Sequence, residues 1–161
     1  MNYQSNFFRI LGLLSAVLML TVLPMPERLA GARPPWVLLL LLYIQLYLPN
    51  YFRIITILVI GMCLDILLST VIGEHAFALL VTTRITARQS SRFNFFTMDQ
   101  QLIWILPCCL LYQMLCLLIN AFLGYHIDWV MTIIGAILGV VIWPWFKLLN
   151  DEMFLIKNYY R

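Results

Sequence analysis

Long apolar runs, separated by short polar or proline-containing breaks, cover almost the whole chain. The runs are continuous rather than alternating at every second position, which predicts helices and argues against strands. Several approach about 20 residues, the length of helix that crosses a bilayer. The pattern predicts an all-α, polytopic integral membrane protein, in which residues 1–161 form a single six-helix transmembrane bundle with spans at 7–23, 36–49, 52–72, 75–91, 101–123 and 129–149.

The first run also fits a signal peptide, because a short apolar core precedes Ala30-Gly31-Ala32, which matches the small-residue cleavage rule. Prolines, Glu27 and Arg28 separate the core from that tripeptide, which favours an uncleaved first span. The second run is short for a full crossing. It opens at Arg33-Pro34-Pro35-Trp36, where proline suits the first turn of a helix and tryptophan suits the membrane interface.

Composition agrees with a membrane protein, since 63% of residues are hydrophobic and 11% are charged. Soluble domains carry about 25% charged residues. The cysteines all lie inside apolar runs, which is typical of small packing residues rather than of disulfides or metal ligands (Cys63, Cys108, Cys109 and Cys116). We therefore expect no metal, no cofactor and no nucleic-acid partner.

The basic residues are unevenly divided between the two sides of the predicted bundle. If the N-terminus is inside, only Arg28 and Arg33 face outward. The other basic residues then lie on the inner side: Arg9, Arg53, Arg84, Arg88, Arg92, Lys147, Lys157 and Arg161. This bias predicts that both termini are cytoplasmic.

The third predicted span carries a small, polar stripe. Gly61, Asp65 and Ser69 are spaced four apart, so they share one helix face. A carboxylate in hydrocarbon costs roughly 2.5–3.5 kcal/mol on insertion scales, so we expect Asp65 to face the bundle interior and a partner. Gly73 then begins the turn into the fourth span.

Arg84 on the fourth span has two interpretations. It begins a row with Arg88 and Arg92, which suits a basic helix end in the cytoplasmic headgroups. Alternatively, counting along the helices from the turn at residues 73–75 places Arg84 at a depth similar to that of Asp65, so that the two would form an ion pair. In the fifth span, Gln113 and Asn120 are expected to form interhelical hydrogen bonds.

No catalytic motif is visible, so we do not expect an enzyme. His75 and His126 lie at predicted outer turns, beside Glu74 and Asp128 respectively. These could bind a metal only if the loops converged, and polar turn residues are the simpler interpretation. A membrane interaction subunit is favoured over a transporter, because no internal repeat is visible.

Three stretches in a particular order resemble the MreD family of bacterial rod-shape proteins. They are the run opening at Arg33-Pro34-Pro35-Trp36, the Gly61-x-x-x-Asp65 pattern with Gly73 eight residues on, and Trp143-Pro144-Trp145 near the end of the chain. The last stretch, followed by Lys147, also suits an interfacial aromatic belt. One departure is Glu74-His75, where the family more often has an apolar residue followed by a basic or polar one.

The resemblance implies a non-enzymatic, multi-pass subunit of the bacterial inner membrane that acts in the rod or elongation complex. Its implied partners are MreC directly, MreB, RodA and a penicillin-binding transpeptidase in a larger complex, and membrane lipids. Its implied role is control of cell shape through peptidoglycan synthesis. The family also resembles the substrate-binding subunits of energy-coupling-factor transporters in fold, which leaves a small-ligand or lipid-binding membrane subunit as the alternative.

Overall fold

The computed structural model describes residues 3–23, 33–47, 54–87, 93, 96–124 and 129–154, with side chains described between residues 9 and 150 of these ranges. Over this part the chain forms helices and no strands, which confirms the all-α prediction. The helices are α1 (Tyr3–Val22), α2 (Trp36–Tyr47), α3 (Ile54–Leu68), α4 (Glu74–Ala87), α6 (Met98–Phe122) and α7 (Trp129–Phe154).

Each predicted span overlaps one of these helices. Two of them, α6 and the Trp129–Asn150 part of α7, are long and apolar enough to cross a membrane. Shorter apolar helices occupy Arg9–Val22, Trp36–Tyr47 and Ile54–Leu68. The number of crossings stays a prediction, because length and composition alone support only the two longest helices.

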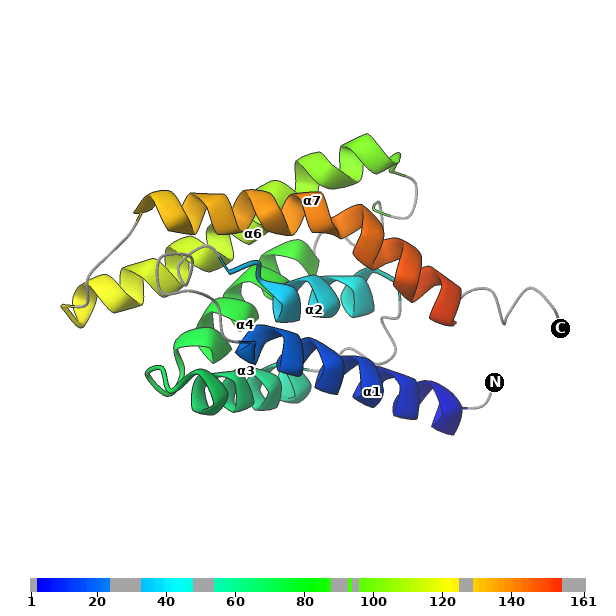
Figure 1. Ribbon diagram of the computed structural model, residues 1–161, viewed down its shortest axis with the longest axis horizontal. Coiled ribbons are helices and arrows are strands. Elements are labelled where there is room, and N and C mark those ends of the chain that lie inside the picture. The colour runs from blue at the N-terminus through cyan, green and yellow to red at the C-terminus, as the bar shows by residue number, and fades with distance from the viewer. Residues whose placement is uncertain are drawn as a thin grey trace, which may run out of the picture.

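The shortest apolar helix, α2, is the centre of the bundle. All residues from Val37 to Leu46 are buried. Figure 1 shows α2 (cyan) between α7 (orange) and α1 (blue), and it also packs against α4. The polar residue of α2 is Gln45, whose amide Nε2 donates a hydrogen bond of 2.9 Å to the Thr83 carbonyl of α4. A helix of 12 residues is about 18 Å long, so the centre of the bundle is shorter than a hydrocarbon core of roughly 30 Å.

Helices α3 and α4 form a closely packed hairpin. One face of α3 is buried, with Ile57, Ile60, Gly61, Leu64 and Asp65 at helical spacing. A Cβ at Gly61 would overlap the Ala76 backbone, lying 2.8 Å from its nitrogen. The two backbones therefore meet at this point, which requires glycine. The opposite face of α3 is exposed and apolar, and includes Ile55, Val59 and Ile66.

The segment before α2 packs against the middle of α7. Pro34 and Pro35 are buried, and a Cβ at Gly139 would lie 3.0 Å from Pro35 Cδ and 3.3 Å from Cys109 Sγ. Gly135, one turn earlier in α7, is buried as well. Small residues thus allow α7 to approach both the proline segment and α6.

The two ends of the bundle differ in what they carry. The start of α1 and the end of α7 lie at one end, whereas the α3–α4 turn lies at the other, together with the end of α6 and the start of α7 (Figure 1). This second end contains the polar residues described next.

Candidate functional site

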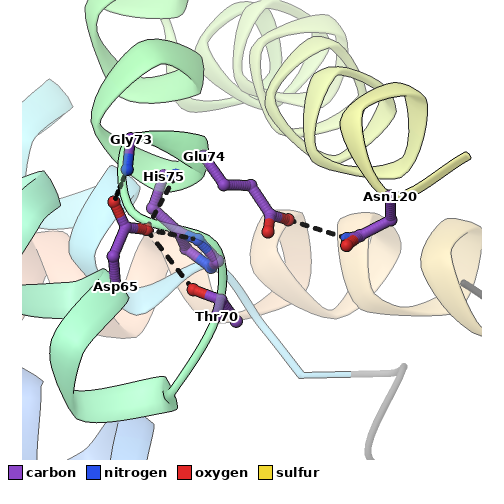
Figure 2. A network of polar contacts seen from close by, with 6 residues as sticks. All are labelled: Asp65, Thr70, Gly73, Glu74, His75 and Asn120. Carbon is purple, nitrogen blue, oxygen red and sulfur yellow. Dashed lines mark hydrogen bonds and ion pairs between the residues drawn. The ribbon is translucent and has the colours of Figure 1, made fainter. Parts of the chain in front are cut away.

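The most concentrated polar network within the described residues surrounds Asp65, whose side chain is fully buried. Its Oδ2 accepts a hydrogen bond of 2.7 Å from the Gly73 backbone N–H, and Oδ1 accepts one of 2.9 Å from the His75 backbone N–H. The Thr70 hydroxyl lies 3.4 Å from Oδ1, and His75 Nδ1 lies 3.0 Å from the same oxygen. Figure 2 shows the carboxylate directed into the turn and the start of α4.

The turn places Asp65 there because α3 ends early. Ser69 has a φ of 52°, in the left-handed region. The Thr70 N–H donates to the Asp65 carbonyl at 3.0 Å, and the Ser69 N–H donates to the Ile66 carbonyl at 3.3 Å. This pair of bonds is a Schellman motif, with serine in the position that glycine usually occupies. Asp65 consequently lies in the last turn of α3, within reach of α4.

Asp65 therefore caps α4 from the preceding helix. The first N–H groups of a helix have no partner within the helix, and the N-terminus carries a partial positive charge. A carboxylate that accepts two of these N–H groups satisfies both requirements, and hydrogen bonds to charged groups are the stronger kind. The main chemical role of this buried acid is to join α3 to α4.

Glu74 extends the network to a third helix. Asn120 Nδ2 of α6 donates a hydrogen bond of 2.7 Å to Glu74 Oε1, and the Glu74 side chain points away from Asp65 (Figure 2). Glu74 is only 3% exposed, and its Oε2 is buried with no hydrogen-bond partner. The His75 ring meets the Tyr112 ring of α6 edge to face, with centroids 6.1 Å apart.

The structure does not support an ion pair between Asp65 and Arg84. Arg84 is exposed, and it lies ten residues beyond the start of α4 at Glu74, about 15 Å along the helix. Asp65 and Arg84 would lie at equal depths only if α3 continued to Ile72, whereas α3 ends at Leu68. That interpretation is therefore wrong, and the side chain facing the carboxylate is His75.

The expected polar stripe on α3 is only partly correct. Gly61 and Asp65 are buried against α4, as the spacing indicates. Ser69 is exposed and lies beyond the end of the helix, so it is not part of that face. Gly73 has a φ of 99°, a conformation that favours glycine and explains its place in the turn.

The motif at residues 143–145 is divided between the interior and the surface. Trp143 is fully buried, and its ring meets Phe93 edge to face at 6.4 Å. Trp145 is 73% exposed, and Pro144 is half-buried within α7. Trp143 is therefore a core residue, whereas the interfacial position of Trp145 stays a prediction with which its exposure agrees.

The motif that opens α2 is held by α6. Gln113 Nε2 donates a hydrogen bond of 3.4 Å to the Arg33 carbonyl, and the Arg33 Nε atom is buried with no partner. Trp36 is half-buried and begins the helix. The interhelical hydrogen bonds expected of Gln113 and Asn120 are thus present, one to the segment before α2 and one to α4.

Sequence reasoning missed the role of three residues in this site: Thr70, Glu74 and His75. The sequence predicts Glu74 and His75 to be polar residues of an outer turn, whereas Glu74 is buried and the His75 ring lies between Asp65 and Tyr112. A usable signal was the aspartate placed before a serine-threonine pair and a glycine, because such residues end one helix and begin another. The contact between Glu74 and Asn120 has no such local signal, since the two are 46 positions apart.

The fold and the network together define a small helical membrane protein whose buried acids connect helices. The chain belongs to the MreD family, because the family of rod shape-determining protein MreD matches residues 1–153. A curated relative is the rod shape-determining protein MreD of Haemophilus influenzae, which is 26% identical over 148 residues, covering 92% of this chain and 91% of the relative. The chain is accordingly a cell-shape membrane protein.

No solved structure matches the chain. The likeness to the substrate-binding subunits of energy-coupling-factor transporters therefore stays a prediction. His126 and Asp128, the other two residues weighed for a metal site, lie outside the described residues.

Proposed function

We propose that this chain is a non-enzymatic, multi-pass subunit of the bacterial inner membrane that binds MreC. Through MreC it would take part in a larger complex with MreB, RodA and a penicillin-binding transpeptidase, and so control cell shape through peptidoglycan synthesis. The observation that carries the proposal is the match to the family of rod shape-determining protein MreD, which extends over residues 1–153.

The use of the polar side chains supports this role. Asp65, Gln45, Gln113 and Asn120 all make contacts that join one helix or segment to another. Polar groups that hold a bundle together are expected of a scaffold. The outward face of α3, in contrast, is apolar over several turns, which suits lipid or the membrane span of a partner.

The arrangement of the helix ends supports a topology with both termini in the cytoplasm. The start of α1 and the end of α7 lie at the same end of the bundle (Figure 1), as an even number of crossings requires. Lys147 lies in the second half of α7 and Arg84 in the last turn of α4, on the side that the basic-residue bias assigns to the cytoplasm.

Co-purification with MreC of the same organism tests the proposal. We expect the intact chain to retain MreC in mild detergent, and we expect its deletion to convert rods into round cells. Asp65→Ala should lower the yield of the complex, whereas Asp99→Ala, which removes an exposed acid at the start of α6, should not. Failure of the unaltered chain to retain MreC would refute the proposed interaction.

The same preparation tests the alternative of a small-ligand or lipid-binding subunit. Mass spectrometry of the purified complex would then detect a stoichiometric small molecule or lipid that survives detergent exchange. A chain that retains such a molecule but not MreC would favour the alternative.

A further inference from the structure

Three potential metal ligands from two helices meet beside the Asp65 network. The Glu74 carboxylate, a ring nitrogen of His75 and Cys116 Sγ each offer one atom, and these atoms all lie within 4.8 Å of one another. Glu74 and His75 begin α4, and Cys116 lies on α6, one turn before Asn120. The sequence predicts Cys116, like the other cysteines, to be a packing residue. Only the folded chain brings Cys116 close to Glu74 and His75.

The unpartnered atom of Glu74 is a second, independent sign of a ligand. Glu74 is 3% exposed, and Oε2 has no hydrogen-bond partner although Oε1 is held by Asn120 at 2.7 Å. A buried carboxylate oxygen without a partner is costly, because nothing replaces the water it has lost. A cation bound at Oε2 would remove that cost.

The neighbours of the ligands are arranged as in known metal sites. Histidines that bind metals commonly face a carboxylate with their other nitrogen, which fixes the ring, and ligating carboxylates are themselves hydrogen-bonded. Here Asp65 Oδ1 lies 3.0 Å from His75 Nδ1, and Asn120 holds the second oxygen of Glu74. Glu74 is therefore held by a hydrogen bond from α6, and the His75 ring lies against the carboxylate of α3.

The chemistry of the set selects a particular class of ion. Thiolate, imidazole and carboxylate together suit Zn²⁺, whereas Mg²⁺ and Ca²⁺ prefer oxygen ligands alone. A thiolate and a carboxylate also balance the two positive charges, so the complex would be neutral, as a site away from bulk water requires. Zinc–ligand distances of about 2.0–2.3 Å place tetrahedral ligands about 3.5 Å apart, so binding needs a contraction of about 1 Å.

We propose that Glu74, His75 and Cys116 form a zinc-binding site that ties the start of α4 to α6. The fourth position is left for water or for a group of another molecule. Cys116 and His75 are partly exposed, which gives the ion a route to the site. Binding releases the thiol proton to solvent and involves no change of oxidation state. The site goes beyond the proposed scaffold function and does not depend on it.

The zinc content of the full-length chain tests this proposal. The protein is purified in detergent with a tag that contains no histidine, exposed to excess Zn²⁺ and desalted, and its metal is measured by mass spectrometry. We expect about one tightly bound zinc per chain, lost in Cys116→Ser and His75→Ala. Cys63→Ser removes an exposed cysteine of α3 and should keep the zinc. Asn120→Ala should weaken binding roughly 10- to 100-fold, as is typical when the partner of a ligand is removed.

A measurement on the unaltered chain guards against variants that fail to fold. Zinc should slow the alkylation of Cys116 by a thiol reagent, while Cys63 in the same molecules should react at an unchanged rate. Equal alkylation of Cys116 with and without zinc would overturn the proposal, as would a zinc content that is the same in the unaltered chain and in Cys116→Ser. Neither result would bear on the retention of MreC.

Discussion

Removing the Asp65 carboxylate is the most direct test of how the α3–α4 hairpin is held. In Asp65→Ala, the N–H groups of Gly73 and His75 lose the acceptors that lie 2.7 Å and 2.9 Å away. Hydrogen bonds to a charged group contribute about 1.5–3 kcal/mol each, so losing both acceptors should cost at least about 3 kcal/mol. We therefore expect the free energy of unfolding to fall by about 3–5 kcal/mol.

Reversible unfolding in mixed detergent micelles, followed by tryptophan fluorescence, measures this change. Two variants calibrate it. Thr70→Val removes only a contact of 3.4 Å, near the limit of a hydrogen bond, and should cost less than about 1 kcal/mol. Asp99→Ala removes an exposed acid from the first turn of α6 and should cost no more than about 1 kcal/mol. If Asp65→Ala and Asp99→Ala unfold at the same concentration of the denaturing detergent, the capping role assigned to Asp65 is incorrect.

Four further changes test other parts of the structure by the same assay. Gly61→Val should cost at least about 1–3 kcal/mol, because its side chain would overlap the Ala76 backbone, whereas Gly12→Val, with no atom within 4 Å, should be tolerated. Ser69→Gly should raise the free energy of unfolding by about 1 kcal/mol, because glycine adopts the left-handed conformation of residue 69 without strain. Ser69→Val should lower the free energy of unfolding, and equal stabilities of the two variants would contradict the Schellman motif. The double change Asp65→Arg with Arg84→Asp should not recover the stability lost in Asp65→Arg. Recovery would show that residues 65 and 84 do form an ion pair. Trp143→Ala should cost about 3–5 kcal/mol because the ring is fully buried, and the loss should clearly exceed that of Trp145→Ala, whose ring is 73% exposed.

The helices were predictable from the sequence because their signal is local. A continuous apolar run that ends at proline, glycine or charge marks a helix wherever it later packs. The same signal cannot tell which helix is central. All of α2 is apolar except Gln45, and the sequence of a lipid-facing helix would be equally apolar. The burial of α2 from Val37 to Leu46 is therefore visible only in the packed structure.

The site was less predictable because its geometry depends on where one helix ends. The spacing of Gly61 and Asp65 correctly assigned them to a buried face. The extension to Ser69 failed because a serine in the left-handed conformation ended α3 there, and hydrophobicity alone continued to Ile72. That difference of one turn moved Asp65 from the middle of a helix to its end, and so changed its partner from Arg84 to His75.

The central position of α2 also has a consequence for biogenesis. During synthesis α2 follows α1, but two of the helices that cover it, α4 and α7, are made later. At roughly 5–20 residues per second, several seconds separate the emergence of α2 from that of α7. In the proposed topology α2 must meanwhile reside in lipid or in the insertion machinery, with Gln45 lacking the Thr83 carbonyl it later bonds. The apolarity of the rest of α2 thus serves the unfinished chain as well as the completed bundle.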